Sequence, residues 1–101
     1  MNKLVRDNIP KFIPATESHS FKFTPLAEPE YGEELKKKLV EEVEEYLQSE
    51  NAEELADIYE VLEAIIKLKS FDFEEIKRIK QKKHDQRGGF EKRLFMERIK
   101  Q

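Results

Sequence analysis

The chain contains no cysteine, which excludes disulfide bonds, thiolate metal sites and catalysis by a thiol. It also has no apolar run that approaches the roughly 20 residues needed to cross a membrane as a helix. The first residues, from Met1 to Asp7, lack the apolar core of a secretion signal. From these absences we expect a cytoplasmic protein with no membrane partner.

Neither sign of charge is in strong excess. The 19 Lys and Arg against 22 Asp and Glu leave a formal net charge of -3, so no overall field favours nucleic acid as a partner. Charge is nevertheless organised locally, because the middle of the chain is acidic and the stretch from Lys77 to Arg93 is mostly basic. The basic stretch leaves weak nucleic-acid binding open, although the net negative charge argues against it.

The chain is poor in apolar residues for its size. Its 101 residues are 38% hydrophobic and 41% charged, which predicts one domain over residues 1–101 with a thin core. Association would bury more apolar surface, so we expect a homodimer or a higher homo-oligomer.

All four prolines lie within residues 1–29, so no long helix is expected there. Beyond them, apolar residues recur at helical spacing and predict three helices: about Glu30 to Gln48, a second that ends at about Leu68, and about Phe73 to Gln86. Asn51 is suited to be the N-cap of the second helix, with Glu54 at its third position.

Two short segments could pair as strands, because the first alternates apolar and polar residues and the second is largely apolar. They are residues 21–23 and residues 93–96. The expected fold is therefore mainly α, with an antiparallel helical hairpin, a third helix stopped by Gly88-Gly89, and a small β element.

Four carboxylates are placed to converge across the hairpin. When the chain folds back at about Ser49-Glu50, Glu42 comes level with Asp57 and Glu45 with Glu54. At about 100° per residue, both i,i+3 pairs lean toward the apolar faces of their helices. Like charges so close need a cation, and a hard divalent ion such as Mg²⁺ prefers oxygen ligands.

The same residues have simpler explanations. A glutamate-rich amphipathic helix is usually a solvated surface, and Glu54 has a separate role in a capping box. A metal-binding or partner-binding helical module without catalysis would show the same pattern.

Motifs across most of the chain resemble the MazG-like, all-α nucleoside triphosphate pyrophosphatase superfamily. That family carries Glu-Glu-x-x-Glu followed by Glu-x-x-Asp, and this sequence has Glu41-Glu42-Val43-Glu44-Glu45 and Glu54-Leu55-Ala56-Asp57. The opening Lys3-Leu4-Val5-Arg6-Asp7-Asn8-Ile9-Pro10 and the closing Arg87-Gly88-Gly89-Phe90 resemble a phosphoribosyl-ATP pyrophosphohydrolase-like subgroup.

The resemblance implies hydrolysis between the α- and β-phosphates of a nucleotide, with release of pyrophosphate and with Mg²⁺, or alternatively Mn²⁺, as cofactor. It implies that the metal ligands are Glu42, Glu45, Glu54 and Asp57. The gap between the two acidic motifs, residues 46–53, is shorter than in many members, so their substrates are not carried over.

The remaining expected roles concern the water and the phosphates. Glu41 or Glu45 is the candidate to orient or deprotonate the attacking water. Basic residues expected to meet the phosphates are Lys3, Arg6, Lys80, Lys83 and Arg87. A solvated basic face explains the last three equally well. Tyr31 and Phe90 could stack on a base, although aromatic residues in such places are more often core or interface.

Overall fold

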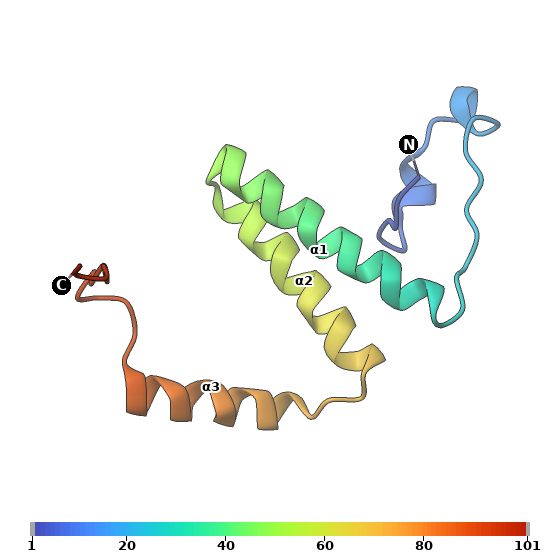
Figure 1. Cartoon of the computed structure of the whole chain (residues 1–101). Helices are drawn as coiled ribbons and strands as arrows, with labels where there is room; N and C mark the ends of the chain where they lie inside the picture. The colour runs from blue at the N-terminus through green and yellow to red at the C-terminus, as the bar shows by residue number, and fades with distance from the viewer. Residues whose placement is uncertain (1, 101) are drawn as a thin grey trace. The chain divides into compact units, whose positions relative to one another are not determined.

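The computed structural model describes residues 2–100, and within them it is helical with no strand. Three α-helices follow two short 3-10 helices (Figure 1): η1 (Ile9–Phe12), η2 (Ala15–Glu17), α1 (Glu30–Ser49), α2 (Ala52–Leu68) and α3 (Phe73–Arg87). The chain divides into two compact units, the first ending at Lys69 and the second beginning at Ser70. None of the helices in this described part is both long and apolar enough to cross a membrane.

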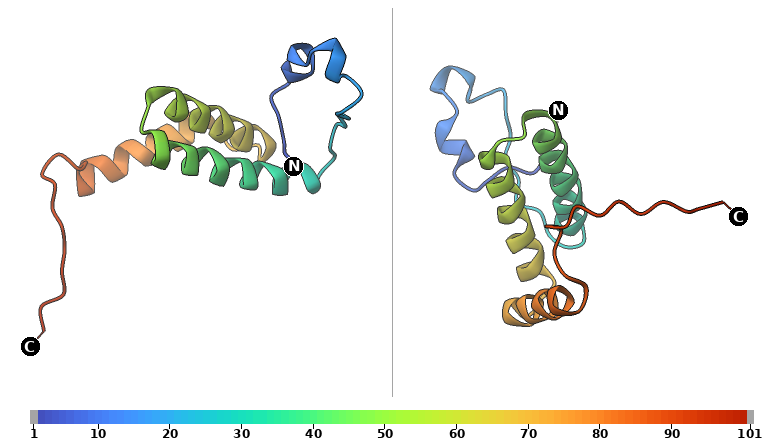
Figure 2. Two further views of the ribbon diagram at one scale, coloured as in Figure 1. Left: turned by 90° about the horizontal axis from the view of Figure 1, so that it is seen from above. Right: turned by 90° about the vertical axis from the view of Figure 1, so that its left-hand side faces the viewer.

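Helices α1 and α2 form the predicted antiparallel hairpin, and they lie side by side in both views of Figure 2. The turn is tight because Glu50 adopts a left-handed conformation with φ of 53°, and its N–H donates to the carbonyl of Tyr46 at 2.7 Å. The Asn51 side chain then accepts from the N–H of Glu54 at 3.1 Å and starts α2. The predicted bounds and cap of this hairpin are confirmed.

The hairpin has a thin core, as the composition indicates. Leu35 and Val61 are its buried apolar residues, with 3% and 8% of their surfaces exposed. Gly32 brings the start of α1 against the end of α2, since a Cβ built there would lie 3.4 Å from Leu68. The N-terminal segment adds half-buried apolar residues of its own, namely Leu4, Val5, Ile9 and Ile13.

Helix α3 belongs to the second unit. It begins where the Asp72 carboxylate accepts from the N–H of Glu74 at 2.9 Å. It ends at Gly88, whose φ of 82° is a left-handed backbone that suits glycine. The predicted third helix and its glycine stop are therefore confirmed.

The predicted β element is wrong for the described residues. Residues 21–23 and 93–96 are not strands, although the rings of Phe21 and Phe23 stack with centroids 6.5 Å apart. Two such short segments would form few hydrogen bonds, and pairing them would require closure of a loop of about 70 residues. The alternation that indicated a strand reflects only local apolar content.

We expect Asn51→Ala to destabilise the chain by about 1 kcal/mol, because it leaves the N–H of Glu54 without its side-chain acceptor. Urea unfolding followed by circular dichroism measures this loss. Asn51→Asp is the matched control, since its carboxylate can accept the same hydrogen bond and should keep most of the stability. Equal stability of the alanine variant and the wild type would contradict the capping role.

Candidate metal centre

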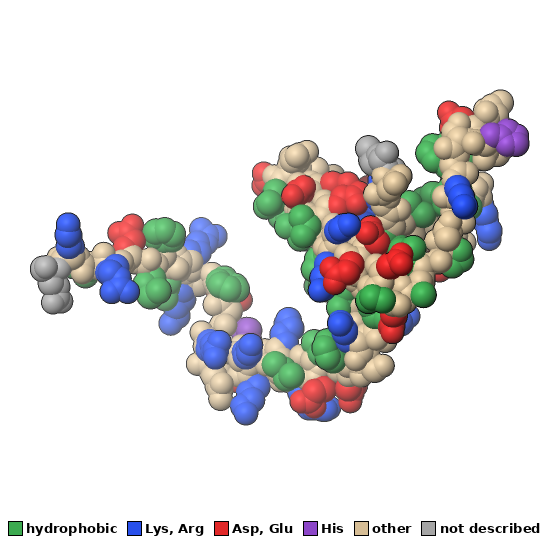
Figure 3. Space-filling model, turned by 45° about the vertical axis from the view of Figure 1, so that its right-hand side comes forward, with side chains coloured by type: hydrophobic (Ala, Val, Ile, Leu, Met, Phe, Trp, Pro, Cys, Tyr) green, Lys and Arg blue, Asp and Glu red, His purple; other side chains and the backbone are tan. Residues whose placement is uncertain are grey.

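Four carboxylates converge on one face of the hairpin. Glu42 and Glu45 come from α1, Glu54 and Asp57 come from α2, and one oxygen of each lies within 4.8 Å of the others. The convergence follows from the tight turn, because each pair has i,i+3 spacing at a similar distance from Glu50. In Figure 3 the acidic side chains gather on the hairpin, with basic side chains among them.

The four carboxylates differ in their exposure to water. Glu42 is buried, with 6% of its surface exposed, while Glu54 and Asp57 are half-buried and Glu45 is exposed. One oxygen each of Glu42 and Glu54 is buried without a hydrogen-bond partner. A buried carboxylate oxygen without a donor is costly, so a cation coordinated at this point would satisfy both oxygens.

Burial raises the pKa of the Glu42 carboxyl above its ordinary value of 4.5. The neighbouring Glu45 carboxylate raises the pKa further, while the Lys38 ammonium opposes the shift. Lys38 lies 3.4 Å from Glu42 Oε1 and also 3.4 Å from Glu41 Oε2, so one ammonium is shared by two carboxylates. The cluster is thus only partly neutralised by its own helices.

The N-terminal segment adds two cations at the rim of the cluster. Arg6 lies 2.7 Å from Asp57 Oδ1 and 3.9 Å from Glu60 Oε1. Lys3 lies 3.4 Å from Glu41. Lys3 and Arg6, which the sequence suggested for phosphate binding, are thus beside the carboxylates. Their contact with phosphate stays a prediction.

The other predicted site residues lie outside the four-carboxylate group. Glu41 pairs with Lys3 and Lys38 and is not among the four carboxylates whose oxygens converge. The basic residues at positions 80, 83 and 87 are on α3, in the second unit, and their role stays a prediction.

The donor set fits a hard cation. All four candidate ligands offer carboxylate oxygen, which suits Mg²⁺, Mn²⁺ or Ca²⁺ and disfavours ions that prefer sulfur.

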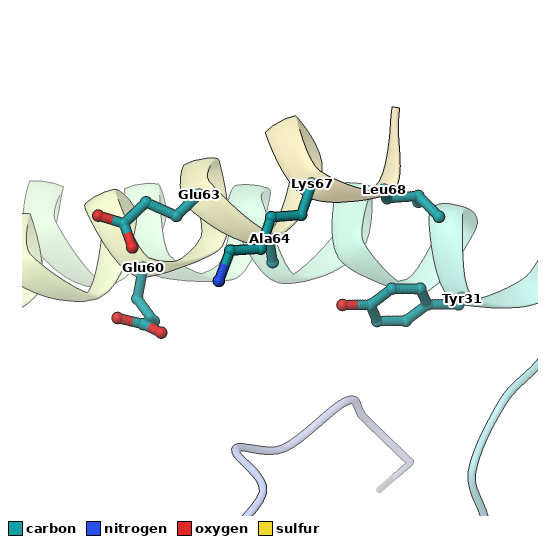
Figure 4. Close-up of a pocket in the computed structure, with 6 residues that line it drawn as sticks. All are labelled: Tyr31, Glu60, Glu63, Ala64, Lys67 and Leu68. Carbon is teal, nitrogen blue, oxygen red and sulfur yellow. The ribbon is translucent and has the colours of Figure 1, made fainter. Parts of the chain in front are cut away.

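A pocket that the sequence did not predict lies on the same hairpin (Figure 4). Its volume is about 370 Å³, and it is lined by Tyr31, Glu60, Glu63, Ala64, Lys67 and Leu68. Five of these residues recur at helical spacing on α2, which is the only sequence signal that could have grouped them. The sixth comes from the start of α1, which the hairpin brings alongside.

Comparison of the chain with protein-family models, with curated proteins and with solved structures finds no match in any of the three. The resemblance to the MazG-like superfamily therefore rests on the motifs themselves.

We expect Glu42→Gln to stabilise the metal-free protein at pH 7, because the neutral amide avoids burying a charge. A raised pKa in the folded state means that the folded chain holds its proton more tightly than the unfolded chain. Stability from this group is therefore present below pH 4.5 and is lost as the pH rises through the folded pKa.

Melting temperatures in EDTA, measured from pH 4 to pH 8, test this linkage. The advantage of the glutamine variant should shrink as the pH falls. It should vanish at a pH where the Glu42 carboxyl is protonated in both the folded and the unfolded chain. Glu44→Gln, an exposed change on the same helix, is the control and should show no such trend. A glutamine variant that melts below the wild type at pH 7 would contradict the assignment.

Proposed function

We propose that the chain is a Mg²⁺-dependent nucleotide pyrophosphohydrolase that cleaves between the α- and β-phosphates and releases pyrophosphate. The observation that carries the proposal is the convergence of four carboxylates, two with buried oxygens that lack a donor. The MazG-like motifs support it, since four of their five acidic residues are the ones that converge. We expect it to act in the cytoplasm, as its composition indicates.

The carboxylates divide into two tasks under this proposal. Glu42, Glu45, Glu54 and Asp57 would hold the metal, which would supply charge stabilisation to the phosphate oxygens and activate water. Glu45 is exposed, so water can reach it, and it can orient or accept a proton from the attacking water. Glu41 is the weaker candidate base, because its carboxylate oxygens are already engaged in ion pairs with Lys3 and Lys38.

Basic side chains would bind the polyphosphate. Arg6 already lies against Asp57 and Glu60, and its planar guanidinium can grip a phosphate with two hydrogen bonds. Lys3 lies at the edge of the same cluster, where it pairs with Glu41. On α3, the spacing of Lys80, Lys83 and Arg87 places these residues within about 60° of one another, so they form one cationic face.

A second copy of the chain would complete the thin core. Val40, Val43 and Leu47 form an exposed apolar stripe along α1, and Leu55, Tyr59 and Leu62 form another along α2. Each such side chain gains about 1.5–3 kcal/mol when fully buried. We therefore propose a homo-oligomer in which these stripes pack against a partner chain.

Sedimentation equilibrium tests the assembly. We expect a mass of at least twice the 12.1 kDa chain for the wild type and a shift toward 12.1 kDa for Leu47→Glu, which places a charge in the apolar stripe. Gln48→Glu adds the same charge beside it and should leave the mass unchanged. A wild type that sediments at 12.1 kDa at every concentration would refute the assembly.

A screen of nucleoside triphosphates and phosphoribosyl-nucleotides with Mg²⁺, with pyrophosphate and phosphate measured separately, tests the activity. Glu42→Gln and Asp57→Asn should each lower kcat by roughly 100-fold or more, the scale expected when an electrostatic group is removed from a reacting centre. Glu44→Gln, which is exposed on the same helix, should keep wild-type activity.

The rival function predicts a different result from the same samples. A metal-binding or interaction module without catalysis would release no pyrophosphate from any nucleotide, and a module that binds no metal would keep its melting temperature in EDTA. Full activity in well-folded Glu42→Gln and Asp57→Asn would show that these carboxylates are not the metal site.

A further inference from the structure

The pocket beside Tyr31 combines apolar, anionic and cationic groups in a small volume. Ala64 and Leu68 contribute apolar surface, Glu60 and Glu63 contribute carboxylates, and Lys67 contributes an ammonium. In Figure 4 the two carboxylates lie toward one end, the Tyr31 ring lies toward the other, and the Lys67 amine lies between them. A volume of about 370 Å³ is within the range of about 300–1,000 Å³ that small-molecule sites occupy.

Helical register places the Tyr31, Ala64 and Leu68 side of this pocket on the same side of the hairpin as the four-carboxylate cluster. Glu63 and Lys67 line the pocket from about 120° and 80° around α2 from Asp57. On α2, Leu68 follows Asp57 by eleven residues, which is a rotation of only about 20° from the same face. On α1, Tyr31 precedes Glu42 by eleven residues and shares its face in the same way. Along each helix axis, the far end of the pocket therefore lies about 16 Å from the cluster.

Arg6 joins the two regions. Its guanidinium pairs with Asp57 of the cluster at 2.7 Å and approaches Glu60 of the pocket at 3.9 Å. One face of the hairpin thus presents, in order, an aromatic pocket, a cation and a group of carboxylates. A nucleotide presents its base, its phosphates and the phosphate-bound metal in the same order.

The groups in the pocket are suited to a base that carries both an amino group and a carbonyl. A carboxylate accepts hydrogen bonds from ring N–H and amino groups, and an ammonium donates to carbonyl oxygen. Tyr31 offers an aromatic ring against which a planar heterocycle can pack. Guanine and cytosine carry a carbonyl and an amino group with two N–H donors, whereas uracil in a nucleoside has carbonyls and a single ring N–H donor.

We propose that this pocket is the nucleobase site and that it prefers guanine or cytosine over uracil. The inference rests on the proposed function for its biological meaning, since the phosphates of the bound nucleotide would extend past Arg6 to the carboxylate cluster. It assigns Tyr31, Glu63 and Lys67 to base recognition.

Nucleosides test the pocket without phosphate or metal. Saturation-transfer NMR on the full chain in EDTA should detect guanosine and cytidine, and uridine should bind about 10-fold more weakly, a difference of about 1.4 kcal/mol. Glu63→Gln replaces one exposed acceptor without changing its shape and should reduce guanosine binding by a similar factor. Tyr31→Ala should also reduce binding of both nucleosides, and Glu44→Gln is the matched control.

The outcomes separate this inference from the proposed activity. Nucleoside binding should persist in Asp57→Asn, so a chain that releases no pyrophosphate but binds guanosine at Tyr31 and Glu63 refutes only the activity. An active chain that binds no nucleoside, or binds all three equally, overturns the base site. In an active chain, Glu63→Gln should raise KM for the nucleotide and leave kcat unchanged, whereas an unchanged KM would contradict base recognition.

Discussion

The structure depends on holding four like charges together at a tight turn. Carboxylate oxygens of Glu42, Glu45, Glu54 and Asp57 lie within 4.8 Å of one another, where their mutual repulsion opposes folding. The hairpin can hold them because the turn is short and its second helix is capped by Asn51. Packing around Leu35 and Val61 adds the apolar contribution. Burial, together with repulsion from Glu45, raises the pKa of Glu42, so a cation bound at this point would stabilise the ionised cluster.

The chain supplies some of that positive charge itself, from segments far apart in sequence. Lys38 belongs to α1 and pairs with Glu41 and Glu42, while Arg6 comes from the N-terminal segment and pairs with Asp57. The exposed pair of Arg6 with Asp57 contributes little to stability, whereas the pair of Lys38 with Glu42 is largely buried. Their importance under the proposed function is positional, because they keep basic groups beside the carboxylates where a polyphosphate would lie. The buried oxygens of Glu42 and Glu54 have no hydrogen-bond partner, and under the proposed function they would coordinate the metal.

The thin core and the candidate site belong to one arrangement. A hairpin with two buried apolar side chains exposes apolar stripes on some faces and carboxylates on another. A partner chain on the stripes would stabilise the hairpin and leave the polar face free. The pocket beside Tyr31 extends that polar face toward the open end of the hairpin, away from the turn. A metal, phosphates and a base would then occupy successive positions along the same pair of helices.

Local sequence determined the elements that short-range physics controls. The helical periodicity, the Asn51 cap and the stop at Gly88 depend on neighbours within a few residues, and each was predicted near its observed position. The convergence of the two acidic pairs was also predictable. A tight turn brings residues that are equally far from it on the two helices to the same height along the hairpin. The role of these carboxylates as metal ligands is still a proposal.

Tertiary structure alone decided the contacts between distant segments. The pairing of Arg6 with Asp57 and the meeting of Tyr31 with Lys67 and Leu68 follow from how the chain folds back, which no local pattern encodes. The failed β element shows the same limit, because alternation at residues 21–23 indicates a strand only when a partner is present. Helix periodicity depends on residues that are close in sequence. Pockets, ion pairs between distant segments and strand pairing require the chain to close long loops, and the entropy cost of that closure cannot be read from a local sequence pattern.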